Sequence, residues 1–446
     1  MPPRAWAGSH GIPLAVSDEL PPGDDFRDNP SLDFGRLVRR VPAYVLRPRS
    51  TAQLAECLRH LAAAGTPYKL RGAGHSSSGE VLTDGGAVVD LAGLAGVVAD
   101  DPAAEEITVL GGTTWLAAWE HLAAAGMRPP AVTDNPRTTV AGTLSMGGVG
   151  DASHLHGTQV AGVRRLVLVT PDGARREARP GDPFFDHALC GHGQLGALAE
   201  VTLATWRRPS TLVGRVLQWG TVEEYLADAA TIAARGLYDY LRGRLVWDDF
   251  RCRVWAIAAR MTADGSAGDE TLDHIRPSAK SRVESLDLLA HARVDPIALW
   301  TFRAPCVELV FPYPEGLAAL RRVDAAVAGA AAVRRHLPRG SSLMLVPGTR
   351  GLPLSPFVAP RCVVLAIRPE PPTLAEARAC EPFLRAAAEE ALAAGGRVYL
   401  SSFPLAGAAL ARQLGDGARS LAALKAAVDP AGLCNRGNLH GWEPSP

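Results

Sequence analysis

The stretch KLRGAGHSSSG, residues 69–79, constrains this chain more than any other. It follows an apolar segment and places glycines at 72, 74 and 79 around His75. Glycines in such a loop usually mark positions where the backbone turns tightly or approaches another group closely. A run of backbone N–H groups in a loop of this kind can bind phosphate. The residues alone leave two interpretations open, a phosphate-binding loop and a plain connection between two strands.

A dinucleotide-binding loop of the Rossmann type fits this stretch poorly. Gly72 and Gly74 match the first half of G-x-G-x-x-G, but the next glycine, Gly79, comes too late. The residues that follow are typical of a loop and a strand, whereas the Rossmann motif opens a helix onto the pyrophosphate. The sequence therefore argues against a Rossmann domain.

Composition limits the class of protein. The 446 residues are 47% hydrophobic and 21% charged, with a formal net charge of zero, which is typical of a globular protein with a sizeable core. A neutral chain does not indicate nucleic acid or an anionic membrane surface as a partner. We find no apolar run that suits a signal peptide or reaches the roughly 20 residues of a membrane span. We therefore expect a cytoplasmic protein.

The cysteine and histidine patterns do not predict a metal site. The seven cysteines are scattered and never spaced C-x-x-C, so we expect reduced, buried thiols rather than a disulfide or zinc framework. His154 and His156 form an isolated H-x-H pair without further partners nearby in the sequence. We expect no metal ion.

The order of elements predicts an α+β protein with two lobes. Residues 36–208 alternate short strands and helices with tight glycine turns, and residues 161–178 read as a hairpin with its turn at 171–173. Longer helices and strands with few glycine loops follow Pro209. We therefore expect a first lobe over 1–208, a second lobe over 209–398, and a return to the first lobe over 399–446.

Several stretches resemble, in the same order, the flavin-binding segments of the vanillyl-alcohol-oxidase/PCMH family of FAD-linked oxidoreductases. RGAGHSSSGE resembles the loop that wraps the pyrophosphate, and residues 133–173 resemble the second segment, particularly that of cytokinin dehydrogenases. LCGHGQLGALAEVTL resembles the segment that closes the flavin domain, and VYLSSF and VDPAGLCNRGN resemble the C-terminal return. The resemblance implies a two-lobed PCMH-type fold whose second lobe is an antiparallel sheet covered by helices.

The resemblance implies FAD as the cofactor, with residues 1–208 as the FAD-binding domain, 209–398 as the substrate domain and 399–446 as the return to the FAD-binding domain. Many members bond the histidine of the first loop covalently to the flavin, so we expect a covalent bond at His75; a histidine hydrogen-bonded to phosphate or backbone is the alternative. Members with a second anchor have a cysteine where this chain has Arg137, so we expect a single bond. Asn438 takes the place of a family glutamine that reaches the flavin edge, and it is one methylene shorter. The residues expected to bind the cofactor are Arg71, Gly72, Ala73, Gly74, His75, Ser76, Gly79, Thr133, Asp134, Thr139, Gly142, Thr143, Ser145, Gly147, Gly148, His156, Gly157, Val201 and Asn438.

Asp134 is the first candidate catalytic residue. It lies five residues before Thr139, the spacing at which cytokinin dehydrogenases keep an aspartate. Removing a hydride from a C–H next to N–H or O–H requires a group that accepts the heteroatom proton, and a carboxylate within hydrogen-bond reach can do so. We expect burial beside the flavin to raise its pKa. An Asx turn before Asn135 and Pro136 is the alternative.

Tyr399 and Glu308 are the other candidate catalytic residues. Tyr399 matches a tyrosine of the family's C-terminal return and either lines the substrate pocket or packs as a core aromatic. Glu308 shares one face of an expected strand with Cys306 and Val310. It either contacts substrate or lies solvated at a sheet edge.

The resemblance implies an FAD-dependent oxidase or dehydrogenase that oxidises a C–H next to nitrogen or oxygen of a small molecule, with O₂ or another electron acceptor. Asn135, Pro136 and Arg137 depart from the family pattern and weaken the case for an isoprenoid cytokinin; Arg137 either suits an acidic or polar substrate or is simply exposed. Oxidative cyclisation or aromatisation is a second possibility, and a non-redox cyclase or binding module with structural FAD is a third. We expect a role in bacterial secondary metabolism, without nucleic-acid or membrane partners.

Overall fold

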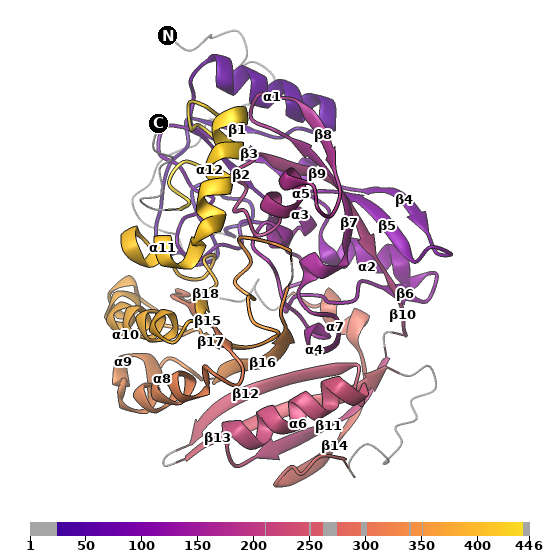
Figure 1. Ribbon diagram of the computed structural model, residues 1–446, viewed down its shortest axis with the longest axis vertical. Coiled ribbons are helices and arrows are strands. Elements are labelled where there is room, and N and C mark those ends of the chain that lie inside the picture. Colours follow the sequence, from indigo (N-terminus) through magenta and orange to yellow (C-terminus); the bar gives the residue numbers. More distant parts are fainter. Residues whose placement is uncertain are drawn as a thin grey trace.

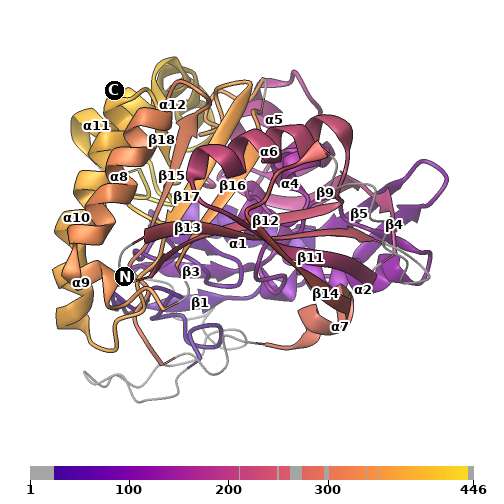
Figure 2. The same ribbon diagram turned by 90° about the horizontal axis from the view of Figure 1, so that it is seen from below.

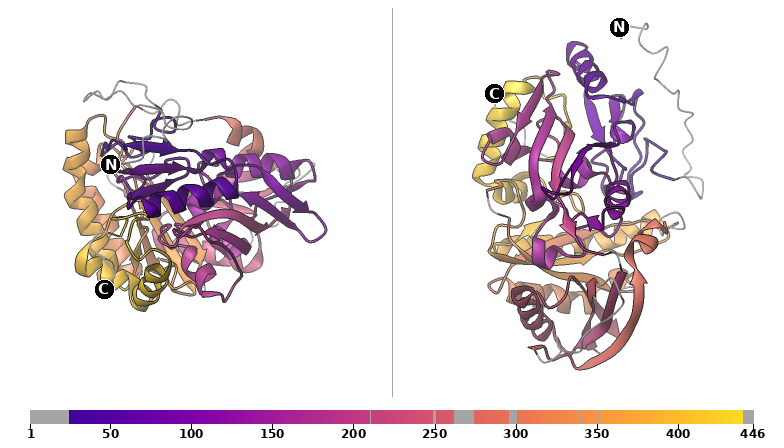
Figure 3. Two further views of the ribbon diagram at one scale, coloured as in Figure 1. Left: turned by 90° about the horizontal axis from the view of Figure 1, so that it is seen from above. Right: turned by 90° about the vertical axis from the view of Figure 1, so that its right-hand side faces the viewer.

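The computed structural model describes residues 25–209, 211–248, 251–261, 274–295, 301–338, 340–349 and 351–439. In these residues two lobes stack on one another. Figure 1 shows the first lobe above and the second lobe below, and Figure 3 shows the same stack from above and from the side. The C-terminal helices run back up along the first lobe (Figure 1).

A small parallel sheet carries the glycine loop of the first lobe. Its strands lie in the order β1–β3–β2, and helix α1 connects β1 to β2 with Ser50 as its N-cap. The loop of residues 72–79 therefore leaves directly from the end of β2. The bounds are β1 (Tyr44–Leu46), α1 (Thr51–Ala63), β2 (Tyr68–Arg71), β3 (Ala87–Asp90) and the 3₁₀ turn η1 (Leu91–Gly93).

A second sheet of the first lobe is antiparallel, with its strands in the order β4–β5–β9–β7–β8. Strands β7 and β8 form the predicted hairpin around residues 171–173. Short helices lie between its strands in sequence. The bounds are β4 (Val97–Asp101), β5 (Glu106–Leu110), α2 (Trp115–Ala123), β6 (Met127–Arg128), α3 (Val140–Leu144), α4 (Ser153–His156), η2 (Gln159–Gly162), β7 (Val163–Val169), β8 (Arg175–Ala178), α5 (Pro183–Ala188), β9 (Ala197–Ala204) and β10 (Trp206–Arg207).

The second lobe is built on one eight-stranded antiparallel sheet, counted over the described residues, in the order β14–β11–β13–β12–β16–β17–β15–β18. Helix α6 packs on its β11–β13 side, and α8 and α10 pack on β15; Figure 2 shows these helices from below. The bounds are β11 (Thr211–Trp219), α6 (Val222–Arg235), β12 (Tyr240–Asp248), β13 (Arg251–Met261), β14 (Ala279–Asp287), α7 (Leu288–Arg293), β15 (Val307–Pro312), α8 (Leu317–Gly329), α9 (Ala331–Arg334), β16 (Ser341–Pro347), β17 (Arg361–Ile367), α10 (Leu374–Ala393) and β18 (Arg397–Val398).

The register of this sheet decides which side chains face the first lobe. Side chains directly opposite one another on paired strands share a face. The residues on the helix-covered face include Gly243, Leu343, Leu365 and Leu309. The other face carries Arg242, Met344, Val364 and Val310. Val149 of the first lobe packs against the apolar members of this second face, so it is the face turned toward the glycine loop.

The C-terminal segment returns to the first lobe beside β2. After α11 (Gly407–Leu414) and α12 (Asp416–Val428), the backbone N–H of Tyr68 donates to Leu433 O at 3.0 Å and the N–H of Asn435 donates to Tyr68 O at 2.9 Å. This bridge lays the tail along the strand that leads into the glycine loop.

The described part of the chain confirms the predicted fold class, an α+β protein whose second lobe is an antiparallel sheet covered by helices. The six cysteines with described side chains are free and buried; Cys252 lies outside these side chains. No helix in the described ranges is both long and apolar enough to cross a bilayer.

Lys425 of α12 holds the returning tail in place, and its loss should destabilise the protein. Its ammonium pairs with Asp429 at 2.9 Å and also donates to the carbonyls of Gln194 and Cys434; the two side chains are 5% and 3% exposed. Removing one partner of a buried pair typically costs about 3–5 kcal/mol. We expect Lys425→Ala to lower the free energy of unfolding by about that amount in guanidinium titrations. The exposed Lys280 provides the control, since Lys280→Ala should change it by less than about 0.5 kcal/mol. A loss below about 1 kcal/mol for Lys425→Ala would contradict this role.

Candidate functional site

The glycine loop presents a run of unused backbone donors. Among the described residues, the N–H groups of Ala73, Gly74, His75 and Ser76 have no backbone or side-chain acceptor. Gly74 has a φ of +69°, the left-handed conformation that occurs in nests, in which consecutive backbone N–H groups bind an anion; we call residues 73–76 the nest. This nest is the strongest indication in the chain of a phosphate site.

Two residues expected to bind the cofactor, Arg71 and Ser76, use their side chains to hold the loop against the segment of residues 26–33. The Arg71 guanidinium is 1% exposed and donates to the carbonyls of Leu32 and Phe26. The Ser76 hydroxyl donates to Asp33 Oδ2 at 2.9 Å, and the same oxygen accepts the N–H of Gly79 at 2.7 Å. Burial raises the pKa of Asp33 to about 6. The expected cofactor contacts of the Arg71 and Ser76 side chains are therefore corrected to a role in anchoring the loop.

The first and second glycine segments meet with no space between them. A Cβ atom on Gly72 would overlap Oγ1 of Thr139, which caps α3 by accepting the N–H of Gly142 at 3.3 Å. Glycine is required at position 72 by this approach. The contact places the start of α3 directly against the loop.

The third segment and the tail complete the same cluster. The N–H groups of Cys190 and His192 donate to Leu144 O at 3.0 Å and Ser145 O at 2.9 Å. At Gly193, where φ is +66°, a Cβ would overlap the amide of Asn435. Asn435 is buried, and its side chain accepts from Leu70 N and donates to His192 O. All the segments singled out in the sequence therefore converge on one place.

His75 lies between the loop and an N-terminal aromatic residue. The Phe34 ring centroid is 4.1 Å from that of His75, and Asn135 Nδ2 is 3.4 Å from His75 Nδ1. Loss of hydration, with smaller contributions from the positive charges of Arg368 and Arg27, lowers the pKa of His75 to about 3. The imidazole is therefore neutral at physiological pH and keeps a lone pair on one ring nitrogen.

Glu308 and Tyr399 come together on the second lobe. Glu308 is 16% exposed in its side chain and pairs with Arg368 at 2.9 Å, and Arg368 lies 5.6 Å from the Phe34 ring. The backbone N–H of Tyr399 donates to Glu308 O at 2.8 Å. Burial, followed by the nearby Glu308 charge, raises the pKa of Tyr399 well above its ordinary value. Tyr399 is therefore a phenol that can donate a hydrogen bond, and Glu308 is an inward-facing, paired carboxylate rather than a solvated edge residue.

Asp134 pairs with an arginine of the second lobe. Its carboxylate forms an ion pair with Arg242 of β12, and the side chains are 54% and 17% exposed. Burial, with the neighbouring charge of Arg244, lowers the pKa of Arg242 to about 10. Asp134 lies at the turn of Asn135 and Pro136, where its carboxylate is partly in solvent.

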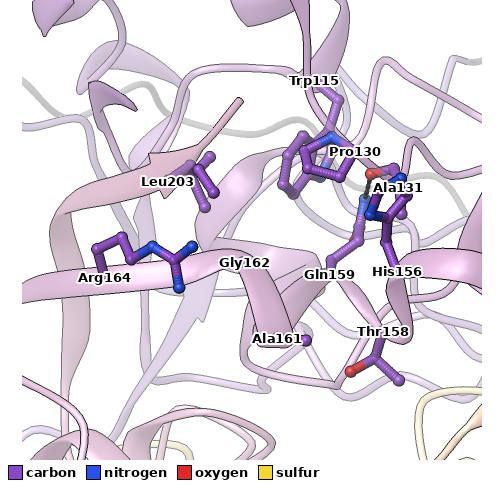
Figure 4. A pocket seen from close by; sticks show the side chains of 11 residues that line it. Trp115, Pro130, Ala131, His156, Thr158, Gln159, Ala161, Gly162, Arg164 and Leu203 are labelled. Carbon is purple, nitrogen blue, oxygen red and sulfur yellow. Dashed lines mark hydrogen bonds between the residues drawn. The ribbon is translucent and has the colours of Figure 1, made fainter. Parts of the chain in front are cut away.

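A pocket of about 140 Å³ adjoins the second segment, within the first lobe (Figure 4). His156, one of the expected cofactor residues, lines it together with Trp115, Gln159 and Arg164. The Gln159 amide donates to Ala131 O at 3.2 Å, while its Oε1 is buried without a hydrogen-bond partner. The unpartnered acceptor and the flat Trp115 ring suit one end of an extended polar ligand.

The remaining expected cofactor residues differ in how far they are exposed to a ligand. Gly142 is exposed, and Thr133, Thr143 and Ser145 are half-buried, so a ligand can reach them. Ala73 is half-buried, and Gly147, Gly148 and Gly157 are buried glycines of the second segment.

One of the expected cofactor residues is corrected. Val201 has no accessible surface and sits in β9 with β5 and β7 on either side, because a central strand buries both of its faces. Asn438 is half-buried, and its side-chain oxygen accepts a hydrogen bond from the Lys69 ammonium.

The sequence interpretation missed several residues of the site. Phe34 lies nearly forty residues before the glycine loop in the sequence, and only the tertiary structure brings its ring to His75. Arg242 and Arg368 end up in the site because of sheet register, which the sequence does not reveal. The family resemblance points to Asn438 in the NRGN run, whereas Asn435 of the same run contacts the third segment.

The donor set fits FAD. The nest at Ala73–Ser76 supplies backbone donors for a pyrophosphate, and the neutral His75 faces the junction of the lobes. The glycines of the second segment leave room for backbone approach, and Gln159 and Trp115 line the adjoining pocket. In the described residues no group of three or more histidine, cysteine or acidic side chains could hold a metal ion; the His154 ring instead contacts Tyr238 O at 2.9 Å.

Comparison with known proteins agrees with this fit. Residues 42–179 match the model of a family described as an FAD binding domain. The chain is 33% identical over 215 residues to an uncharacterized oxidoreductase of the fasciation locus of Rhodococcoides fascians, which covers 48% of this chain and 49% of that protein. It is 31% identical over 255 residues to cytokinin dehydrogenase 7 of Oryza sativa subsp. japonica, covering 53% and 48% of the two chains.

A third relative is also matched over only part of its length. Cytokinin dehydrogenase 2 of Arabidopsis thaliana is 30% identical over 185 residues, 40% of this chain and 36% of that protein. The matches thus span about half the length, or less, of these curated relatives. Residues 42–179 thus match an FAD binding domain, and over the matched half the chain is similar to cytokinin dehydrogenases and to another oxidoreductase, as expected of an FAD-dependent oxidoreductase.

Proposed function

We propose that this protein is an FAD-dependent oxidase or dehydrogenase that removes a hydride from a C–H next to nitrogen or oxygen of a small molecule. The observation that carries the proposal is the free nest at Ala73–Ser76 next to a neutral His75, facing ionisable side chains of both lobes. Bound FAD would supply the hydride acceptor and pass the electrons to O₂ or another acceptor. A cytoplasmic location and a role in bacterial secondary metabolism belong to the same proposal; free, buried cysteines are usual in a reducing compartment.

His75 is suited to bond covalently to the flavin. A nitrogen must carry a lone pair to form such a bond, and the low pKa of His75 keeps the ring neutral over the physiological range. Asn135 and Phe34 fix the orientation of the ring by a polar contact on one side and a tilted aromatic contact on another. These contacts reduce the freedom that the ring would lose on bonding.

Asp134 is the candidate proton acceptor, and Tyr399 is a candidate hydrogen-bond donor. The carboxylate of Asp134 is next in sequence to Asn135, which contacts His75. Its partial exposure lets it pass a proton to water after each turnover. Tyr399, which stays protonated, can orient a substrate oxygen or nitrogen, and Glu308 is held in place by Arg368.

A first prediction concerns the anchor. The purified protein should be yellow and should keep its flavin in the pellet after acid precipitation, because His75 holds the flavin covalently. His75→Ala should release flavin into the supernatant, while His121→Ala, a surface histidine paired with Asp100, should behave like the wild type. Flavin absorbance of pellet and supernatant measures this. Complete release from the wild type would disprove the covalent bond.

A second prediction concerns Asp134. Asp134→Asn should keep the flavin and its spectrum but slow flavin reduction by substrate by about 10²–10⁴-fold, because the general base is lost. Stopped-flow absorbance with the best reductant found in a panel of amines and alcohols measures the rate. Asp416→Asn, at a side chain that is 92% exposed, is the control. If Asp134→Asn reduces within about threefold of the wild-type rate, Asp134 is not the base.

A further inference from the structure

Arg242 belongs to strand β12 of the second lobe and lies in the candidate site. The proton transfer proposed for Asp134 assigns no role to it. Its side chain is 17% exposed, and its Nε is buried without a hydrogen-bond partner among the described groups. Its ion pair is made with Asp134. A guanidinium offers five donors in a planar fork, so this pair leaves part of the fork unused.

The position of Arg242 points it toward the reacting centre. Gly243, its neighbour on β12, faces Tyr225 of α6. Because side chains alternate along a strand, Arg242 leaves the sheet on the opposite face, the one turned to the first lobe. Its partner Asp134 adjoins Asn135, whose amide is 3.4 Å from His75 Nδ1. Arg242 is thus linked to the flavin-anchoring histidine through two consecutive residues.

The exposure of the two ion pairs distinguishes Arg242 from Arg368. Arg368 pairs with Glu308, whose side chain is only 16% exposed, so opening that pair would leave a buried carboxylate uncompensated. Asp134 is 54% exposed, so its carboxylate can return to water when another anion takes its place. Exchange of one carboxylate for another leaves the largely buried guanidinium neutralised throughout. Arg242 is therefore the arginine of the site that can change partner at low cost.

We propose that Arg242 binds a carboxylate of the substrate, so that the substrates are small organic acids that also carry an oxidisable C–H next to nitrogen or oxygen. This assignment rests on the proposed function and names its substrate class. In the resting protein Asp134 occupies the fork. A substrate carboxylate takes over the bond to Arg242 by the bidentate contacts that carboxylates form with arginine, and it leaves Asp134 free to accept a proton.

The test uses the flavin-loaded protein and two matched probe pairs, acetate with acetamide and phenylacetate with phenylacetamide. Difference spectra of the flavin and calorimetry both give dissociation constants. In the wild type at least one acid should bind at least about tenfold more tightly than its amide. Arg242→Gln should weaken binding of that acid by about 10- to 100-fold and leave the amide unchanged, because a charge-assisted bond is lost. Arg242→Lys should fall between the two.

Two further variants separate the proposal from a structural role. Asp134→Asn should bind the acid about two- to fivefold more tightly, because the competing carboxylate is gone, although it slows reduction. Arg361→Gln, at an exposed arginine of the same sheet, should change nothing. Flavin content and spectrum of each variant report whether the cofactor site is intact.

The outcomes are distinct. Equal binding of acid and amide in both pairs, equal loss of acid and amide binding in Arg242→Gln, or weaker acid binding in Asp134→Asn would each overturn the proposal. Failure of the proposed function would be seen separately, as a protein that takes up no flavin or whose flavin no reductant reduces. In that case the calorimetric comparison of acid and amide still decides whether Arg242 binds carboxylates.

Discussion

Direct contact between backbone segments at the glycine loop is the constraint on which the rest of the structure depends. Thr139 of the second segment touches the loop where Gly72 has no side chain, and Asn435 of the tail touches the third segment at Gly193. Hydrogen bonds from Cys190 and His192 tie the third segment to the second. These contacts draw together pieces from far-apart parts of the sequence and leave the N–H groups of residues 73–76 free for an anion.

The second lobe completes the site by placing charged groups over this loop. One face of its sheet carries Arg242, Glu308 and Arg368, and their acidic and basic members are paired with one another or with Asp134. The two ion pairs differ in how far their carboxylates are exposed to solvent. Glu308, whose side chain is 16% exposed, is held by Arg368, while the Asp134 side chain is 54% exposed and can exchange its partner. A rigid pair beside an exchangeable one is a workable arrangement for binding a substrate and accepting its proton.

Features that depend on local chemistry could be predicted from the sequence. The glycine-rich loop, the hairpin around residues 171–173 and the division into two lobes follow from residue type and spacing, whereas the antiparallel second sheet was implied by the family resemblance; the matched FAD binding domain and the strand order agree with them. Features that depend on register could not. Val201, expected to contact the cofactor, lies in β9 between two strands, and Arg242 belongs to the site only because β12 turns that side chain to the first lobe.

Two neighbouring asparagines give a second example of a feature that the sequence does not reveal. Asn435 and Asn438 lie in one short coil, and residue type does not say which is buried against the third segment. The left-handed backbone of Asn435, with a φ of +49°, and the Lys69 ammonium that binds Asn438 decide it. Exposure of Asp134 likewise follows from the turn at Asn135–Pro136, whose direction is a tertiary property.

A crystal structure of the protein as purified tests the central claim, that the converging segments form an FAD site at the junction of the lobes. We expect flavin density with its pyrophosphate on the N–H groups of Ala73–Ser76 and its ring system beside His75, between the loop and the face that carries Arg242 and Glu308. Flavin bound elsewhere, or a nest at Ala73–Ser76 that stays free of phosphate in a flavin-containing crystal, would contradict it.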